Sequence, residues 1–153
     1  MRGPQIPNPL SRLDRQLLMI AALVSIIGMA DAFYLTLAHL ATSSIWCANS
    51  ATCSEVLQSA YAAPGGVPLA GIGTLAYCAT FSLAILAAFG YRHAHTLLAL
   101  LVAVMLAVTL VLLFVQSAVL HAFCGHCLLS AIATVLLTGC VFVERCIGRK
   151  ERH

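Results

Sequence analysis

The stretch LLALLVAVMLAVTLVLLFVQSAVL, residues 97–120, decides the fold class. It contains no Asp, Glu, Lys or Arg, and a helix needs about 20 predominantly apolar residues to cross a bilayer. Three further stretches have the same character, at residues 17–40, 69–89 and 123–143, and Asp31 is the only one of these four charged types in them. The sequence therefore predicts four membrane-spanning segments.

The whole composition agrees with a membrane protein. Of the 153 residues, 61% are hydrophobic and 8% are charged, whereas about 25% of residues are charged in a typical soluble protein. The apolar stretches are rich in Leu, Ala and Val and do not alternate with polar residues, which favours a helical bundle over a barrel. We expect an all-α membrane protein: a four-transmembrane-helix bundle forming a single membrane domain over residues 1–153, with a lid loop at 41–68 that contains a short helix.

The basic residues predict the orientation. Cytoplasmic loops of membrane proteins carry an excess of Lys and Arg, and with four spans every Lys and Arg of this chain falls on one side. They are Arg2, Arg12, Arg15, Arg92, Arg145, Arg149, Lys150 and Arg152. Both termini are therefore expected in the cytoplasm, and the lid loop on the extracytoplasmic face. The net charge of +3 reflects this topology and gives no indication of nucleic-acid binding.

Four of the seven cysteines fall at the predicted extracytoplasmic face. Cys47 and Cys53 lie in the lid loop, and Cys124 and Cys127 lie where the last span begins. Disulfides persist in that compartment. The other three cysteines are placed within or beyond the spans, where we expect small apolar packing residues; they are Cys78, Cys140 and Cys146.

Both outer pairs have the local features of reactive thiols. Thr52-Cys53-Ser54-Glu55 is a capping-box pattern, which places Cys53 in the first turn of a short helix, where the helix dipole stabilises a thiolate. Cys124-Gly-His-Cys127 opens the last span, so its two sulfurs fall on one helix face and predict a reducible disulfide. His126, when protonated, would stabilise a thiolate there.

A dithiol that is oxidised repeatedly needs an electron acceptor. The sequence has no nucleotide-binding glycine motif and no haem attachment motif. An oxidant dissolved in the bilayer is the available alternative, and we expect a quinone pocket among the helices beneath Cys127.

Together these residues resemble the vitamin K epoxide reductase family in its bacterial, quinone-linked form. The resemblance runs from Gly28 to Ala131 and covers both cysteine pairs with their intervening motifs. These motifs are Cys53-Ser54-x-Val56-Leu57-x-Ser59-x-Tyr61, Gly66-Val67-Pro68-x-x-Gly71, Tyr77, and Phe123-Cys124-x-x-Cys127.

The resemblance implies a role for each outer cysteine. Cys47 would exchange with a separate thioredoxin-like partner, Cys53 would pass electrons to Cys124, and Cys127 would face ubiquinone or menaquinone. Such a relay would support disulfide formation in exported proteins at a bacterial inner membrane.

Two further positions belong to the quinone region by resemblance. Ser59 matches the family's loop Ser or Thr, and Ala131 stands where animal members carry a tyrosine. The animal lid also has an asparagine over the quinone with no counterpart here. These departures disfavour reduction of vitamin K epoxide, which stays an alternative substrate.

Several other polar residues are candidates for accessory roles. Asp31 lies deep within the first span, where a carboxylate is costly, so it is expected to face the bundle and to handle protons, anchor the lid or fix packing. Tyr34 and Trp46 are interpreted as interface anchors, and His93 and His95 as turn residues without a specific role. His39 and His121 flank the outer mouth and are candidates for a proton relay.

Two rival functions use the same residues. A soft-metal carrier could bind an ion through the four outer cysteines, although the site is expected to hold no metal. The other four-helix family of quinone-linked thiol oxidases carries its Cys-X-X-Cys before the second pair, which is the reverse of the order here.

Overall fold

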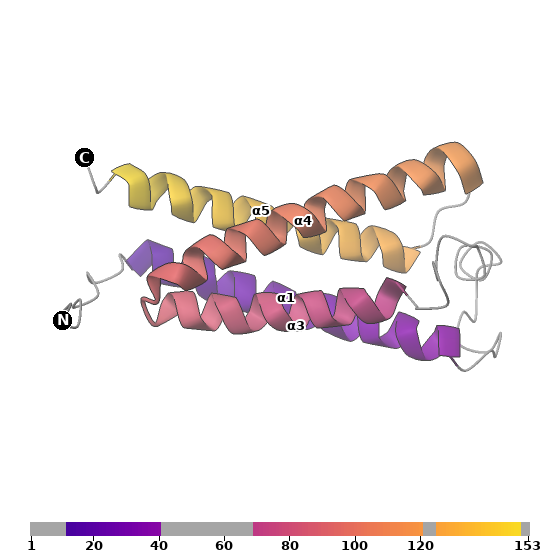
Figure 1. Cartoon of the computed structure of the whole chain (residues 1–153), viewed down its shortest axis with the longest axis horizontal. Helices are drawn as coiled ribbons and strands as arrows, with labels where there is room; N and C mark the ends of the chain where they lie inside the picture. Colours follow the sequence, from indigo (N-terminus) through magenta and orange to yellow (C-terminus); the bar gives the residue numbers. More distant parts are fainter. Residues whose placement is uncertain (1–11, 41–68, 121–124, 151–153) are drawn as a thin grey trace.

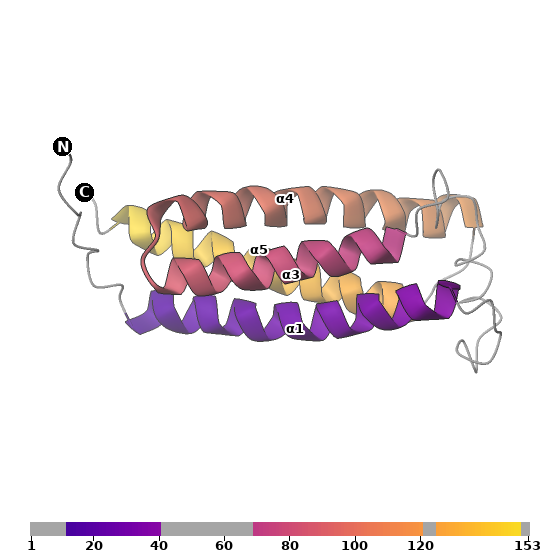
Figure 2. The same cartoon turned by 60° about the horizontal axis from the view of Figure 1, so that its bottom comes forward.

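The computed structural model describes residues 12–40, 69–120 and 125–150. Within them the chain is helical apart from one short turn. The elements are α1 (Arg12–Leu40), α3 (Leu69–Ala88), α4 (Arg92–Val115), the short π-helix η2 (Gln116–Leu120) and α5 (Gly125–Lys150). Figures 1 and 2 show the long helices running side by side along one axis. The predicted lid loop, residues 41–68, lies outside the described residues, and so do its two cysteines, Cys47 and Cys53.

The four long helices form a closed ring. α1 packs against α3 and α5, and α4 packs against the same two helices from the other side. The start of α1, the α3–α4 turn and the end of α5 lie at one end of the bundle, and η2 and the start of α5 lie at the other (Figure 1). The all-helical, four-helix prediction is confirmed. The helices are longer than the apolar stretches alone indicate, since α1 begins at Arg12, α4 at Arg92, and α5 continues to Lys150.

The outer surface of the described helices is apolar, as a bilayer requires. All four long helices are long and apolar enough to span a membrane, and each exposes large hydrophobic side chains. Examples are Leu23, Leu75, Val111 and Ile132, which are 61%, 72%, 62% and 59% exposed. Contiguous apolar surface on this scale would be unstable in water. The chain is therefore an integral membrane protein.

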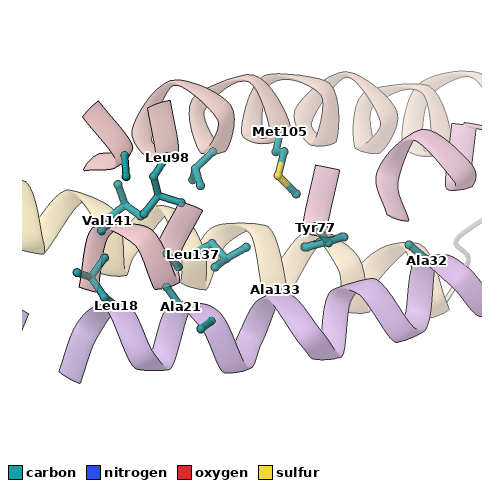
Figure 3. Close-up of a cluster of buried hydrophobic side chains, with 14 residues drawn as sticks. Leu18, Ala21, Ala32, Tyr77, Leu98, Met105, Ala133, Leu137 and Val141 are labelled. Atoms are coloured by element: carbon teal, nitrogen blue, oxygen red, sulfur yellow. The ribbon is translucent and has the colours of Figure 1, made fainter. Parts of the chain in front are cut away.

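The interior is filled largely by small and branched side chains. Leu18, Leu98 and Leu137 are almost fully buried, and Figure 3 shows Leu18, Leu98 and Val141 toward one end of the cluster, with Tyr77 nearer to Ala32. Buried alanines let the helix backbones approach closely, which favours helix association in membranes. They are Ala21, Ala22, Ala32, Ala84, Ala87, Ala94 and Ala133.

A glycine turn joins α3 to α4. Gly90 has φ 87°, a left-handed conformation that glycine adopts without strain. Its N–H donates to the carbonyl of Ala87 at 2.8 Å, and the N–H of Tyr91 donates to the carbonyl of Leu86 at 3.2 Å. This is the Schellman arrangement, which satisfies the last carbonyls of a helix and lets α4 return directly antiparallel to α3.

Most hydroxyl groups within the spans bond to their own helix. Ser25, Thr36 and Thr80 each donate to the carbonyl four residues earlier, at 2.8 Å in every case. Such bonds satisfy a polar group where no water is at hand. The hydroxyl of Thr80 also reaches Sδ of Met105 at 3.3 Å, so it links α3 to α4.

The interpretation of the three inner cysteines as packing residues is only partly right. Cys78 and Cys146 are exposed on the bundle surface and Cys140 is half-buried. Because lipid is as apolar as a protein core, a small thiol is tolerated on either side of a helix. All three are free thiols.

Candidate functional site

Cys127 is the one predicted redox cysteine that the described residues include. It is the third residue of α5, in the first turn, and is half-buried. The N–H groups of a first turn have no partners within the helix and favour negative charge, so a thiolate is favoured at this position. Cys47, Cys53, Ser59 and Cys124 lie outside the described residues.

A carboxylate–imidazole contact lies next to Cys127 in the chain. Asp31 Oδ1 on α1 is 2.7 Å from Nδ1 of His126 on α5. The Asp31 side chain is 5% exposed, whereas that of His126 is 44% exposed. The pair joins a buried acid on α1 to a partly exposed ring on α5, and it connects residues 95 positions apart in the sequence.

Tyr34 on α1 also contacts the ring of His126. Its ring centroid is 5.2 Å from that of His126, with the two planes tilted by 32°. Asp31 and Tyr34 are three residues apart and so share a face of α1. The expectation that Tyr34 is a membrane-interface anchor misses this ring contact, which holds His126 from a second direction.

One carboxylate oxygen of Asp31 could accept a further hydrogen bond. Oδ2 is buried and has no hydrogen-bond partner among the described residues. Burying a carboxylate is costly unless it is paired and hydrogen-bonded, and acidic groups inside membranes are commonly functional. The prediction that Asp31 faces the bundle therefore agrees with its burial, and its partner is His126.

Tyr77 supports the same part of α5 from below. Its hydroxyl lies 3.0 Å from the carbonyl oxygen of Ser130, 2.9 Å from Oγ of Ser130 and 3.0 Å from Oγ1 of Thr134. Ser130 comes one turn after Cys127. Because Tyr77 is 2% exposed and is carried by α3, it crosses the ring of helices and fixes the start of α5.

The opposite end of the bundle has a second acid–histidine contact. His95 Nδ1 on α4 is 2.9 Å from Oε1 of Glu144 on α5, and Glu144 is 7% exposed. Arg145 donates to the carbonyl oxygen of His95 at 3.2 Å. The interpretation of His95 as a turn residue without a role is therefore wrong, since its ring ties α4 to α5.

Sequence reasoning names Asp31 and His126 separately and does not pair them. A signal for the pair exists in the composition. The described residues include no Lys or Arg at the end of the bundle where Asp31 lies, and residues 41–68 and 121–124 contain none in sequence, so a histidine is the cationic side chain that could pair with a buried acid there.

These features define a class of protein: an all-helical membrane protein whose sequence has a Cys-X-X-Cys motif ending in the first turn of its last described helix. The family model for the vitamin K epoxide reductase family matches residues 19–142, and the chain belongs to that family. No curated protein matched the chain. Enzymes of this family are quinone-dependent thiol oxidoreductases, and this is the activity that membership gives the chain.

The described residues fit the quinone that the family uses. A quinone headgroup needs an apolar site with a few polar groups that bond its two oxygens. Gln116 in η2, at the same end of the bundle as Cys127 (Figure 1), is 4% exposed and its Oε1 has no hydrogen-bond partner in the described part of the chain. An amide can donate to a quinone carbonyl and accept from a quinol hydroxyl. Ala131, which the sequence assigns to the quinone region, is an apolar residue of α5 that is buried in the bundle.

Proposed function

We propose that the chain relays electron pairs from a separate thioredoxin-like protein, through its two cysteine pairs, to ubiquinone or menaquinone. The relay supports disulfide formation in exported proteins. Family membership supports the chemistry. The observation that carries the proposal is the place of Cys127 in the first turn of α5, at the end of the bundle where the described residues include no Lys or Arg.

The thiol steps each exchange one disulfide for another. The reduced partner attacks the Cys47–Cys53 disulfide at Cys47 and leaves as a disulfide, which gives two thiols in the lid loop. Cys53 then attacks Cys124, and Cys127 leaves as a thiolate. Attack of Cys47 on Cys53 releases Cys124, so the electron pair now resides on Cys124 and Cys127.

The last step regenerates the Cys124–Cys127 disulfide. A bound quinone supplies a two-electron oxidant for this dithiol. Cys127 presents the reacting sulfur, with Ala131, Gln116 and Ser59 as the residues that would hold the headgroup. Tyr77 keeps the first turns of α5 in place through Ser130 and Thr134, so it acts on the site through α5.

The basic residues orient the relay. Among the described residues, every Lys and Arg lies at the end of the bundle opposite to Cys127. The positive-inside rule puts that end in the cytoplasm, so Cys127 and the lid loop face the extracytoplasmic side of a bacterial inner membrane, where secreted proteins acquire disulfides.

A reconstituted assay tests the proposal. The purified protein in lipid nanodiscs is given a reduced thioredoxin-like protein and ubiquinone, and quinone reduction is followed by absorbance. We expect turnover with the parent chain, none with Cys127→Ser, and nearly parental turnover with Cys78→Ala, because Cys78 is a free thiol exposed on the surface of α3. Turnover that persists in Cys127→Ser excludes the relay.

A further inference from the structure

We propose that Asp31 and His126 form the proton acceptor for the Cys124–Cys127 dithiol. Neutral His126, oriented by Asp31, takes up a thiol proton when the dithiol is formed and keeps it beside Cys127 until the dithiol is oxidised. This inference rests on the proposed function and assigns the two residues one joint role within it.

The contact determines which ring nitrogen is free. A carboxylate accepts a hydrogen bond and cannot donate one when it is ionised, so Nδ1 of His126 donates to Oδ1 of Asp31 across 2.7 Å. In a neutral imidazole the other nitrogen, Nε2, then carries the lone pair. Asp31 therefore holds the tautomer in which Nε2 accepts a proton, as the acid of a nucleophile–histidine–acid triad does.

The ring lies close to Cys127 in the chain and is partly exposed. His126 is the residue directly before Cys127, with their Cα atoms about 3.8 Å apart; because adjacent side chains on a helix do not face each other, the proposal has the proton pass between the ring and the sulfur through water. The His126 side chain is 44% exposed, which leaves the ring open to this exchange. Asp31, in contrast, is buried and remains next to the ring.

Among residues 12–40, 69–120 and 125–150, few other titratable groups are placed near His126. Tyr34 is the other one that α1 presents to His126, and Cys127 is its neighbour on α5. α3 contains no Asp, Glu, Lys, Arg or His. The charged and histidine residues of α4 are confined to its first turn, at the far end of the bundle. Of the titratable groups in the described helices, His126 is therefore the one proposed to compensate a charge change at Cys127.

The pair is unsuited to a purely structural task. Asp31 is buried with Oδ2 unpartnered among the described residues, and a well-packed apolar side chain is often neutral or more stabilising in place of a buried ion pair. By comparison, α1 also packs on α5 along the bundle, and buried residues of both helices belong to one apolar cluster. The proposed proton transfer gives the buried carboxylate a role beyond packing.

The proton count closes over one cycle. Reduction of the Cys124–Cys127 disulfide adds two electrons; one proton goes to the Cys124 sulfur and one to His126, which leaves Cys127 as a thiolate beside an imidazolium. Oxidation removes the two electrons, forms the sulfur–sulfur bond and releases both protons, one from Cys124 and one from His126. Two electrons and two protons are the complement that a quinone acceptor would require.

Histidine NMR tests the inference without the quinone. The protein is labelled with ¹⁵N-histidine in nanodiscs, and the ring signals are compared at pH 7 between the disulfide form and the form reduced with excess dithiothreitol. We expect His126 to carry its proton on Nδ1 in the disulfide form and to become protonated on both nitrogens in a several-fold larger fraction on reduction. Cys127→Ser should remove this response.

His95 is the internal control, because its Nδ1 also lies close to a buried carboxylate, that of Glu144 at 2.9 Å. It lies 31 residues before His126 in sequence, and Glu144 is roughly 27 Å along α5 from His126 at 1.5 Å rise per residue. The His95 signals should not change on reduction, and Glu144→Gln should leave the response of His126 intact.

Asp31→Asn separates charge from position. Asparagine can still accept the Nδ1 hydrogen bond, so the ring stays in place, but no negative charge balances the imidazolium. We expect the redox response of His126 to be lost or several-fold smaller. If His126 does not respond to reduction in the parent chain, or if Asp31→Asn responds fully, the inference is overturned. Turnover in Cys127→Ser overturns the proposed function instead, so the two failures are distinct.

Discussion

Gly28 on α1 lies directly against the ring of Tyr77 on α3. A Cβ atom added at Gly28 would come 2.6 Å from Cζ and 2.8 Å from Cδ1 of that ring, which is closer than carbon atoms approach in folded proteins. The glycine therefore lets α1 approach the ring of Tyr77. The hydroxyl group of the same side chain bonds to α5. Three helices meet at this one ring, below Cys127.

Gly28→Ala should destabilise the bundle. The ring of Tyr77 is 2% exposed and cannot move without breaking its bonds to α5, and overpacking of this kind costs about 1–3 kcal/mol. Gly73→Ala is the matched control, because its Cβ would meet Ala32 at 3.8 Å, an ordinary contact, and alanine favours a helix. Thermal unfolding in detergent should show a lower midpoint for the first variant only.

Tyr77→Phe should loosen the start of α5 without changing the apolar packing. It removes a hydroxyl within 3.0 Å of three oxygen atoms on Ser130 and Thr134, and a hydrogen bond contributes about 1 kcal/mol. Amide hydrogen exchange near Cys127 should become faster. Ser82→Ala, which removes an exposed hydroxyl bonded within α3, should leave that exchange unchanged; equal exchange in Tyr77→Phe would contradict the support role.

Loss of Glu144 should destabilise the opposite end. Glu144→Ala removes the carboxylate that lies 2.9 Å from Nδ1 of His95, and removing one partner of a buried polar contact is destabilising. The expected result is a lower unfolding midpoint with quinone reduction retained at a permissive temperature. Arg145→Ala is the control, because its bond to the His95 carbonyl is exposed and should cost much less. A larger effect from Arg145 would reverse the assignment.

Thiol labelling checks the orientation. A membrane-impermeant maleimide applied to the outside of intact cells, after mild reduction, should label Cys47 or Cys53 and not Cys146, which is exposed near the end of α5. Single-cysteine variants make the assignment direct. Labelling of Cys146 alone would place the basic end outside and contradict the positive-inside argument.

The number and type of helices could be predicted from the sequence because bilayer thickness fixes the length of an apolar span. The face that each helix turns inward could not. In water, polar residues mark the outer face of a helix, but in lipid both faces are apolar. Leu18 and Leu23 look alike in sequence, yet Leu18 is 1% exposed and Leu23 is 61% exposed.

The features of the site that depend only on the local sequence could be predicted. The first-turn position of Cys127 follows from the start of the last apolar stretch, and the burial of Asp31 follows from the cost of a carboxylate in hydrocarbon. The Asp31–His126 contact depends on the rotation of α5 about its axis, which residues from three helices set together. The same reason explains why the ring contact of Tyr34 and the His95–Glu144 pair were missed.

The most direct test of the account is the trapped intermediate of the relay. In a Cys47→Ala variant, Cys53 has no partner in the lid and should attack the Cys124–Cys127 disulfide and remain bonded to Cys124, which releases Cys127 as a thiol. Non-reducing peptide mapping by mass spectrometry identifies the bond, and Cys53→Ala is the matched variant, in which Cys47 should form a mixed disulfide with the partner. The account predicts a Cys53–Cys124 disulfide in Cys47→Ala and no Cys47–Cys124 disulfide in Cys53→Ala. A Cys47–Cys124 disulfide in Cys53→Ala without a Cys53–Cys124 disulfide in Cys47→Ala would contradict it, and so would the absence of any bond between the lid and Cys124 in both variants.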